Sequence, residues 1–226
     1  PSLQKQTLVS RECFGPCFSP DGDRVAFVSG PQLDRSWLQN PPDTIFTMAA
    51  GGTGQPVNTG IAVDMNPPDD WTFWPGAHPA LFWVRRADGD YFYWVSRCRE
   101  GRGVFRAKLG TSTRGELLYS DDFFWGAFDR AGTSVLATMD WAVYRIDLAA
   151  QTQTSIGGGC NPAVSPDGNM LMHNLGWGSS TCSDNWGYEH GGCHVLNWQD
   201  LSCVRTFRYE CNGDMNKWSH HDEDIV

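Results

Sequence analysis

The sequence lacks a long apolar run and has few basic residues. No stretch of its 226 residues approaches the roughly 18 consecutive apolar residues of a membrane-spanning helix. Lys and Arg number 17 against 26 Asp and Glu, which gives a net charge of −9, and the basic residues form no cluster. A nucleic-acid backbone would find no matching counter-charge on such a chain. The sequence therefore predicts no membrane span and no nucleic-acid partner.

Signatures of several catalytic and cofactor-binding sites are also missing. The sequence has no Gly-x-Ser-x-Gly nucleophile elbow, no Cys-x-x-Cys pair and no Cys-x-x-Cys-His haem-attachment motif. His190 and His194 are separated by a segment with two glycines, which oppose a helix that would align both side chains on a metal ion. The acidic clusters, such as Asp121 with Asp122, do not follow the EF-hand spacing. We therefore predict a protein that is not an enzyme and that holds no cofactor and no metal ion.

Helical periodicity is nearly absent, because 25 Gly and 13 Pro interrupt the chain throughout. Short runs of β-branched and aromatic residues recur instead. Residues 16–27, which include Ser-Pro-Asp-Gly, are echoed by residues 162–172. In this turn Pro presets φ, Asp accepts a hydrogen bond from the backbone ahead of it, and Gly accepts a positive φ. Each copy therefore predicts a strand, a turn and a second strand.

Weaker copies of the turn lie near residues 89, 132 and 223, and further strand-like runs follow the first and third full copies. The turns recur at intervals of about 36 to 67 residues, around the 40 to 45 residues of a four-stranded propeller blade. The prediction is an all-β fold, a single β-propeller domain of about five four-stranded blades. The approximate blades are 13–63, 78–120, 123–156, 160–208, and 215–226 together with 1–10.

The strand count leaves the fifth predicted blade incomplete. The chain opens at Pro1 without Met or an apolar leader, which we interpret as the mark of a processed or excised chain. Propellers complete their last blade with a strand from the other terminus, and about three of the four strands are found here. The sequence is expected to be a fragment of a longer protein. The alternative is that a neighbouring subunit supplies the strand by strand addition.

Residues 18–27, which read Phe-Ser-Pro-Asp-Gly-x-x-Val-Ala-Phe, and their copy at 164–172 resemble the WD40-like repeat of TolB-type β-propellers, found in bacterial envelope and secreted proteins. The resemblance covers the turn and two strands in two blades. It implies the propeller fold. It implies little about activity, because such propellers serve as binding scaffolds, peptidase gates and receptor modules.

Eight cysteines, an even number, predict disulfides and hence an oxidising compartment, so that the protein is secreted or on the cell surface. Neighbours in sequence suggest one bridge between Cys182 and Cys193 and a second between Cys203 and Cys211. The other four cysteines, Cys13, Cys17, Cys98 and Cys160, have no predicted partner.

The 11 Trp residues divide into two groups. Trp83, Trp125 and Trp218 lie beside hairpin turns within predicted inner strands, and we expect them in the core between blades. The candidate ligand-binding residues lie instead in Gly-, Pro- and Asp-rich connections, where an indole face can pack on a sugar ring. They are Trp37, Trp71, Trp74, Trp177, Trp186 and Tyr188. The competing interpretation is that these side chains cap the ends of the blades.

The predicted function is non-catalytic binding of a protein or glycan partner, or assembly, on a disulfide-stapled extracellular propeller. A carbohydrate-binding propeller that uses the loop Trp residues is the first alternative. A glycoside hydrolase of propeller fold is the second, because paired carboxylates across a central pocket would serve that reaction.

Overall fold

The structure of the chain is a computed structural model, which describes residues 13–29, 43–63, 81–98, 101–123, 125–174 and 192–208. These residues form sixteen β-strands in four antiparallel sheets, and no helix occurs among them. It follows that this part of the chain holds no helix that could cross a membrane. The fold is all-β, as predicted, and each sheet is one blade of a β-propeller.

The strands follow one another in chain order within each sheet. Blade 1 consists of β1 (Cys13–Phe18), β2 (Arg24–Ser29), β3 (Asp43–Ala49) and β4 (Val57–Val63). Blade 2 consists of β5 (Phe82–Arg86), β6 (Gly89–Cys98), β7 (Gly101–Lys108) and β8 (Glu116–Ser120). Blade 3 consists of β9 (Trp125–Phe128), β10 (Ser134–Met139), β11 (Ala142–Asp147) and β12 (Thr152–Gly158). Blade 4 consists of β13 (Ala163–Val164), β14 (Met170–Asn174), β15 (Gly192–Asn197) and β16 (Cys203–Arg208). The predicted fifth blade, 215–226 with 1–10, lies outside the described residues.

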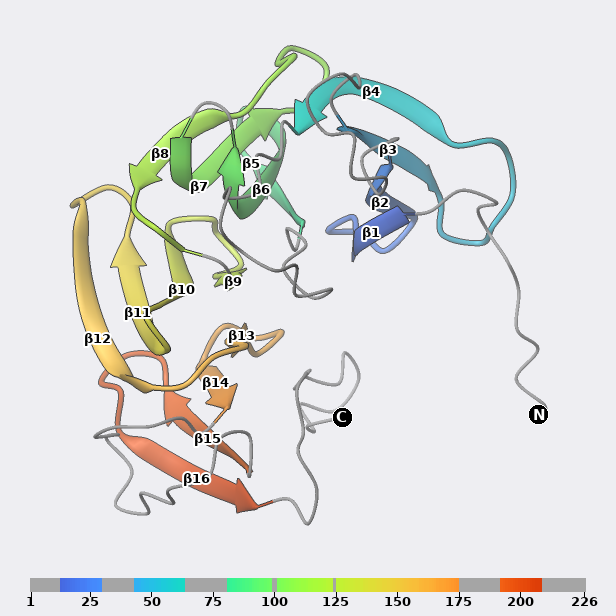
Figure 1. The fold of residues 1–226 in the computed structure, drawn as a ribbon. Coiled ribbons are helices and arrows are strands. Elements are labelled where there is room, and N and C mark those ends of the chain that lie inside the picture. Colours follow the sequence, from blue (N-terminus) through green and yellow to red (C-terminus); the bar gives the residue numbers. More distant parts are fainter. Residues whose placement is uncertain are drawn as a thin grey trace, which may run out of the picture.

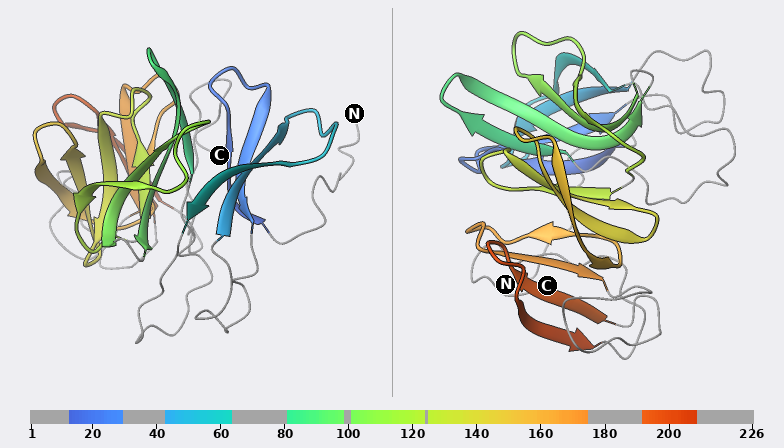
Figure 2. Two further views of the ribbon diagram at one scale, coloured as in Figure 1. Left: turned by 90° about the horizontal axis from the view of Figure 1, so that it is seen from above. Right: turned by 90° about the vertical axis from the view of Figure 1, so that its left-hand side faces the viewer.

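The four blades form an arc around a common centre (Figure 1). The first strands β1, β5, β9 and β13 lie toward the centre, and the last strands β4, β8, β12 and β16 lie at the outside. Neighbouring blades touch through the inner strands, since β9 contacts both β6 and β13 and β1 contacts β5. Figure 2 shows the twist of each sheet, which lets successive blades pack face to face.

The core lies between the blades. In β6, Phe92 and Trp94 pack against blade 1, while Tyr93 and Val95 alternate with them and pack against blade 3. All four side chains are buried, because both faces of this sheet are covered. This explains why residues 91–95 read as a continuous apolar and aromatic run instead of an alternating one.

Candidate functional site

The Ser-Pro-Asp-Gly turns join the first two strands of blades 1 and 4, and they share one hydrogen-bond pattern. In blade 1, Ser19 Oγ accepts the N–H of Arg24 at 2.9 Å and donates to Asp21 Oδ1 at 2.6 Å. In blade 4, Ser165 Oγ accepts the N–H of Met170 at 2.9 Å and donates to Asp167 at 2.5 Å. Both serines are buried. The repeated turn is therefore a backbone-capping device, and its serines are not placed as nucleophiles.

We expect Ser19→Ala and Ser165→Ala each to lower the free energy of unfolding by about 1–2 kcal/mol, because a backbone N–H loses its acceptor in a buried turn. Urea unfolding followed by Trp fluorescence measures this loss. Ser202→Ala is the matched control, since Ser202 is exposed and its hydroxyl donates a hydrogen bond to the Asp200 carboxylate, two residues away. An equal loss in all three variants would contradict the assigned role.

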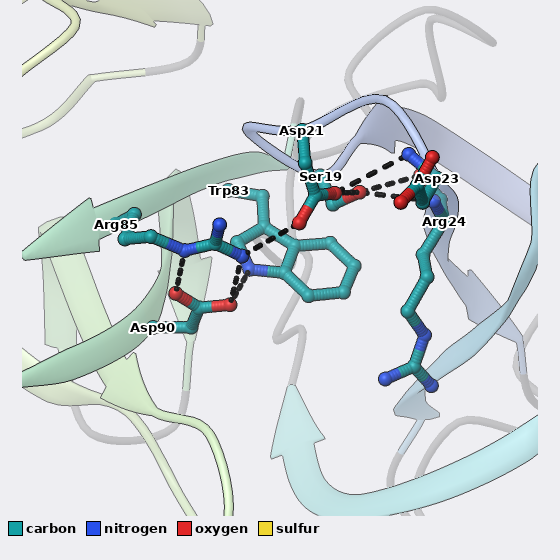
Figure 3. Close-up of polar contacts among 7 residues, drawn as sticks. All are labelled: Ser19, Asp21, Asp23, Arg24, Trp83, Arg85 and Asp90. Carbon is teal, nitrogen blue, oxygen red and sulfur yellow. Dashed lines mark hydrogen bonds and ion pairs between the residues drawn. The ribbon is translucent and has the colours of Figure 1, made fainter.

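The Asp21 turn also joins blade 1 to blade 2 (Figure 3). Arg85 Nη2 donates to Asp21 Oδ2 at 3.0 Å, and its Nε donates to Asp90 Oδ1 at 2.8 Å. The indole N–H of Trp83 donates to the other oxygen of Asp90 at 3.1 Å. On the blade 1 side, the guanidinium of Arg24 lies 5.8 Å from the centre of the Trp83 ring. We call these five residues the blade 1–2 junction.

Both carboxylates of the junction are held in their charged form. The hydrogen bonds from Ser19 and Arg85 lower the pKa of Asp21 to about 2. Arg85 likewise lowers the pKa of Asp90. The Arg85 and Asp21 side chains are 50% and 41% exposed, so water screens their attraction and the ion pair contributes little to stability. The junction orients two blades, and its carboxylates are poor proton donors.

A second polar group surrounds Tyr91 on the other face of the β5–β6 hairpin. Arg86, Arg106 and Lys108 all lie within 6 Å of the centre of its ring, at 5.9, 5.3 and 5.5 Å. The Tyr91 hydroxyl donates to Asp88 at 2.5 Å, and Lys108 pairs with the same carboxylate at 3.1 Å. The hydrogen bond to Tyr91, followed by that to Lys108, lowers the pKa of Asp88. The Asp88 carboxylate is therefore also paired with other side chains of blade 2.

Two buried histidines face each other in the middle of blade 4. His173 of β14 pairs with His194 of β15, and their ring centres are 5.6 Å apart. His173 Nδ1 lies 2.9 Å from the carbonyl oxygen of Asn174, so this nitrogen is the donor and carries the proton of the neutral ring. Burial, with a smaller contribution from His194, lowers the pKa of His173 to about 4. No group of three or more His, Cys, Asp or Glu residues placed to hold a metal ion occurs within the described residues.

One large aromatic group of blade 3 is exposed to solvent. Trp141 lies in the β10–β11 turn and is 43% exposed. Trp125, at the start of β9, contacts it edge to face, with ring centres 6.5 Å apart and an interplanar angle of 63°. Asp140, next to Trp141, is also exposed. The candidate site is this group, Trp125, Asp140 and Trp141, which lies at the opposite end of blade 3 from the β9–β10 turn.

The aromatic residues singled out by the sequence fall into two groups in the structure. The six predicted ligand-binding residues lie outside the described residues: Trp37, Trp71, Trp74, Trp177, Trp186 and Tyr188. Of the predicted core Trp residues, Trp83 is buried as expected, Trp125 is only half-buried, and Trp218 lies outside the described residues. Sequence reasoning missed Trp141. Only two residues separate the strand-like runs that end at Met139 and start at Ala142. This spacing indicates a tight two-residue turn, and it could have predicted that Trp141 lies at the tip of a hairpin.

The two predicted bridges each involve one described cysteine. Cys193 is buried in β15, opposite Asn174, and its predicted partner Cys182 lies outside the described residues, so this bridge stays a prediction. Cys203 belongs to a disulfide, but its predicted partner Cys211 lies outside the described residues, so that pairing stays a prediction.

The thiol of Cys17 packs against the core between blades 1 and 2. Burial raises its pKa to about 12. At neutral pH it is therefore protonated and a poor nucleophile.

Comparison with known proteins shows the fold. No protein-family model and no curated protein matches the chain. Among solved structures, 254 chains match it. One is a protein assigned as TolB from Agrobacterium tumefaciens, with a TM-score of 0.54 and 13% sequence identity over 92% of this chain. The chain spans 65% of that structure's length. The likeness supports a TolB-like β-propeller fold and, at this identity, nothing about ligand or activity.

Proposed function

We propose that the protein is a non-catalytic, extracellular binding or assembly scaffold built on a β-propeller. The observation that carries the proposal is the exposed indole of Trp141, which packs on the half-buried Trp125, because large aromatic surface left in solvent is typical of recognition sites. The disulfide at Cys203 supports an oxidising compartment, and hence secretion or display on the cell surface. The partner is a protein or a glycan.

The carboxyl groups favour binding over glycoside hydrolysis. A glycosidase needs one carboxylic acid whose pKa is raised, so that it can protonate the leaving group. Among the described residues, every carboxyl group with a shifted pKa is shifted downward: Asp21, Asp88, Asp90, Asp167 and Asp200. Turnover of chromogenic glycosides that is lost on replacing one carboxylate would overturn the scaffold proposal.

In self-assembly by addition of a strand to a sheet edge, the partner would be a second copy of the chain. Exposed apolar side chains on outer strands, Val57 of β4 and Val204 of β16, are compatible with pairing at sheet edges. We expect the sedimentation coefficient to rise reversibly between about 1 and 100 µM protein, because at a micromolar Kd the bound fraction changes over this range. A monomer at every concentration would contradict self-assembly and leave binding of another partner as the function.

Carbohydrate binding is the second candidate function. The same exposed indole favours it, since a pyranose ring packs on an aromatic face. It is distinguished from assembly by the ligand, which is a small sugar and not a second chain.

A further inference from the structure

The β10–β11 turn holds Trp141 in a backbone conformation that does not suit it. Asp140 and Trp141 are the two central residues of the hairpin, between the paired residues Met139 and Ala142. Their φ angles are +48° and +59°. Two-residue turns with both φ values positive favour Asp-Gly or Asn-Gly, because Gly has no side chain to clash with the backbone. A bulky residue at the second position opposes the turn.

Burial does not explain the indole either. Trp141 keeps 43% of its surface in solvent, although Trp94 and Trp83 of blade 2 are almost fully enclosed. The turn would form more readily with glycine at this position. A residue that is costly to the backbone and leaves 43% of its surface in solvent points to a role beyond folding.

Trp125 fixes the orientation of the exposed ring. The two indoles meet edge to face at 63°, a preferred geometry for aromatic pairs. Trp125 is anchored in β9, which pairs with β10 from Thr138 to Val135. The Trp141 ring is therefore held before a ligand arrives, which reduces the entropy lost on binding.

The chemistry of this group suits a sugar. We infer that Trp141 and Asp140, braced by Trp125, bind the pyranose rings of neutral glycans. The indole face would pack on the C–H face of a sugar, and the exposed Asp140 carboxylate would accept hydrogen bonds from its hydroxyls. The net charge of −9 disfavours acidic sugars. This inference rests on the proposed binding function and names the ligand class of the same site.

The β10–β11 turn joins the second and third strands of its blade. The equivalent connections of blades 1 and 4 leave from Ser29 and Asn174 and return at Asp43 and Gly192. Trp37, Trp177, Trp186 and Tyr188 belong to those connections but lie outside the described residues. The inference is carried by blade 3 alone.

The test begins with the whole 226-residue chain on an array of neutral glycans that includes cello-, manno- and chito-oligosaccharides. We expect binding to at least one of these, and isothermal titration calorimetry then gives its Kd. Trp141→Gly should weaken binding at least tenfold, because the stacking surface is lost. Trp141→Phe should retain part of the affinity, and Asp140→Asn should weaken it about threefold to tenfold, since hydrogen bonds to a charged acceptor are the stronger ones.

The variants separate loss of the site from loss of the fold. Trp141→Gly creates the Asp-Gly turn that this hairpin favours, so its urea midpoint should equal or exceed that of the wild type. Phe18→Ser is the matched control, because Phe18 is an exposed aromatic residue of β1, beside the Ser19 turn at the other end of its blade, and its loss should leave the Kd unchanged.

Two results would overturn the inference: an array with no bound neutral glycan, or a Trp141→Gly variant that binds as tightly as the wild type. Either result leaves the scaffold function to be judged by sedimentation. Hydrolysis of a bound glycan, in contrast, would overturn the scaffold function while leaving the sugar site in place.

Discussion

Gly103→Ala is expected to lower the free energy of unfolding by about 3–5 kcal/mol, the largest effect of any substitution considered for this protein. Gly103 lies within β7 at a φ of +144°, opposite Ser120 of β8. A Cβ placed there would meet the carbonyl oxygen of Tyr119 at 1.9 Å. That oxygen belongs to the backbone of the paired strand, so the sheet itself must shift to accommodate a methyl group.

Gly110→Ala is the matched control, because Gly110 follows the same β7 strand in the β7–β8 connection. Its φ is +83°, and a Cβ there would meet nothing within 4 Å. This variant carries the backbone strain without the clash and should cost about 1–2 kcal/mol. Urea unfolding of both variants, followed by Trp fluorescence, gives the comparison. Equal losses would show that the close approach of β7 and β8 does not exist in solution.

The stability of the protein is expected to fall by about 3 kcal/mol between pH 6.5 and pH 4 because of His173 alone. In the unfolded chain this imidazole titrates near pH 6.5, whereas burial lowers its pKa in the folded protein to about 4. Above pH 6.5 both states are neutral and stability is unaffected. As the pH falls below 6.5, the unfolded state takes up a proton that the folded state resists. The free energy of unfolding therefore decreases until the folded protein is protonated near pH 4.

His173→Leu isolates this contribution. Leucine is apolar and fits a strand face that already carries Leu171. The difference in urea midpoint between pH 7 and pH 4.5 should be smaller in the variant than in the wild type, since the remaining titrating groups are common to both. Parallel pH profiles would contradict the burial of a neutral His173.

The turns were predictable because their chemistry is local. Ser19 and Ser165 bind backbone groups five residues ahead, within a single turn, and Gly22 and Gly168 adopt the positive φ that the motif requires. Everything needed to recognise these hairpins lies within about six residues of sequence. The all-β propeller fold then followed from the recurrence of that unit.

The contacts between blades were not predictable in the same way. Arg85 and Asp21 are 64 residues apart, and nothing in the pattern of either segment indicates that they meet. Likewise, His173 faces His194 because of the register of β14 and β15, a property of the pairing and not of either strand.

The sequence by itself determined that the protein is built from repeated strand–turn–strand units, that it is acidic, and that it forms a propeller, because hydrogen bonds within a turn and apolar patterning within a strand are encoded over a few residues. Only the tertiary structure decided which aromatic side chains are core and which are displayed. Trp83 and Trp125 occupy equivalent positions, each in the fourth residue pair from the turn that joins the first two strands of its blade. Trp83 is nevertheless buried between blades, whereas Trp125 supports an exposed indole. Exposure depends on what the neighbouring blade places opposite each residue, and that is fixed only when the blades pack.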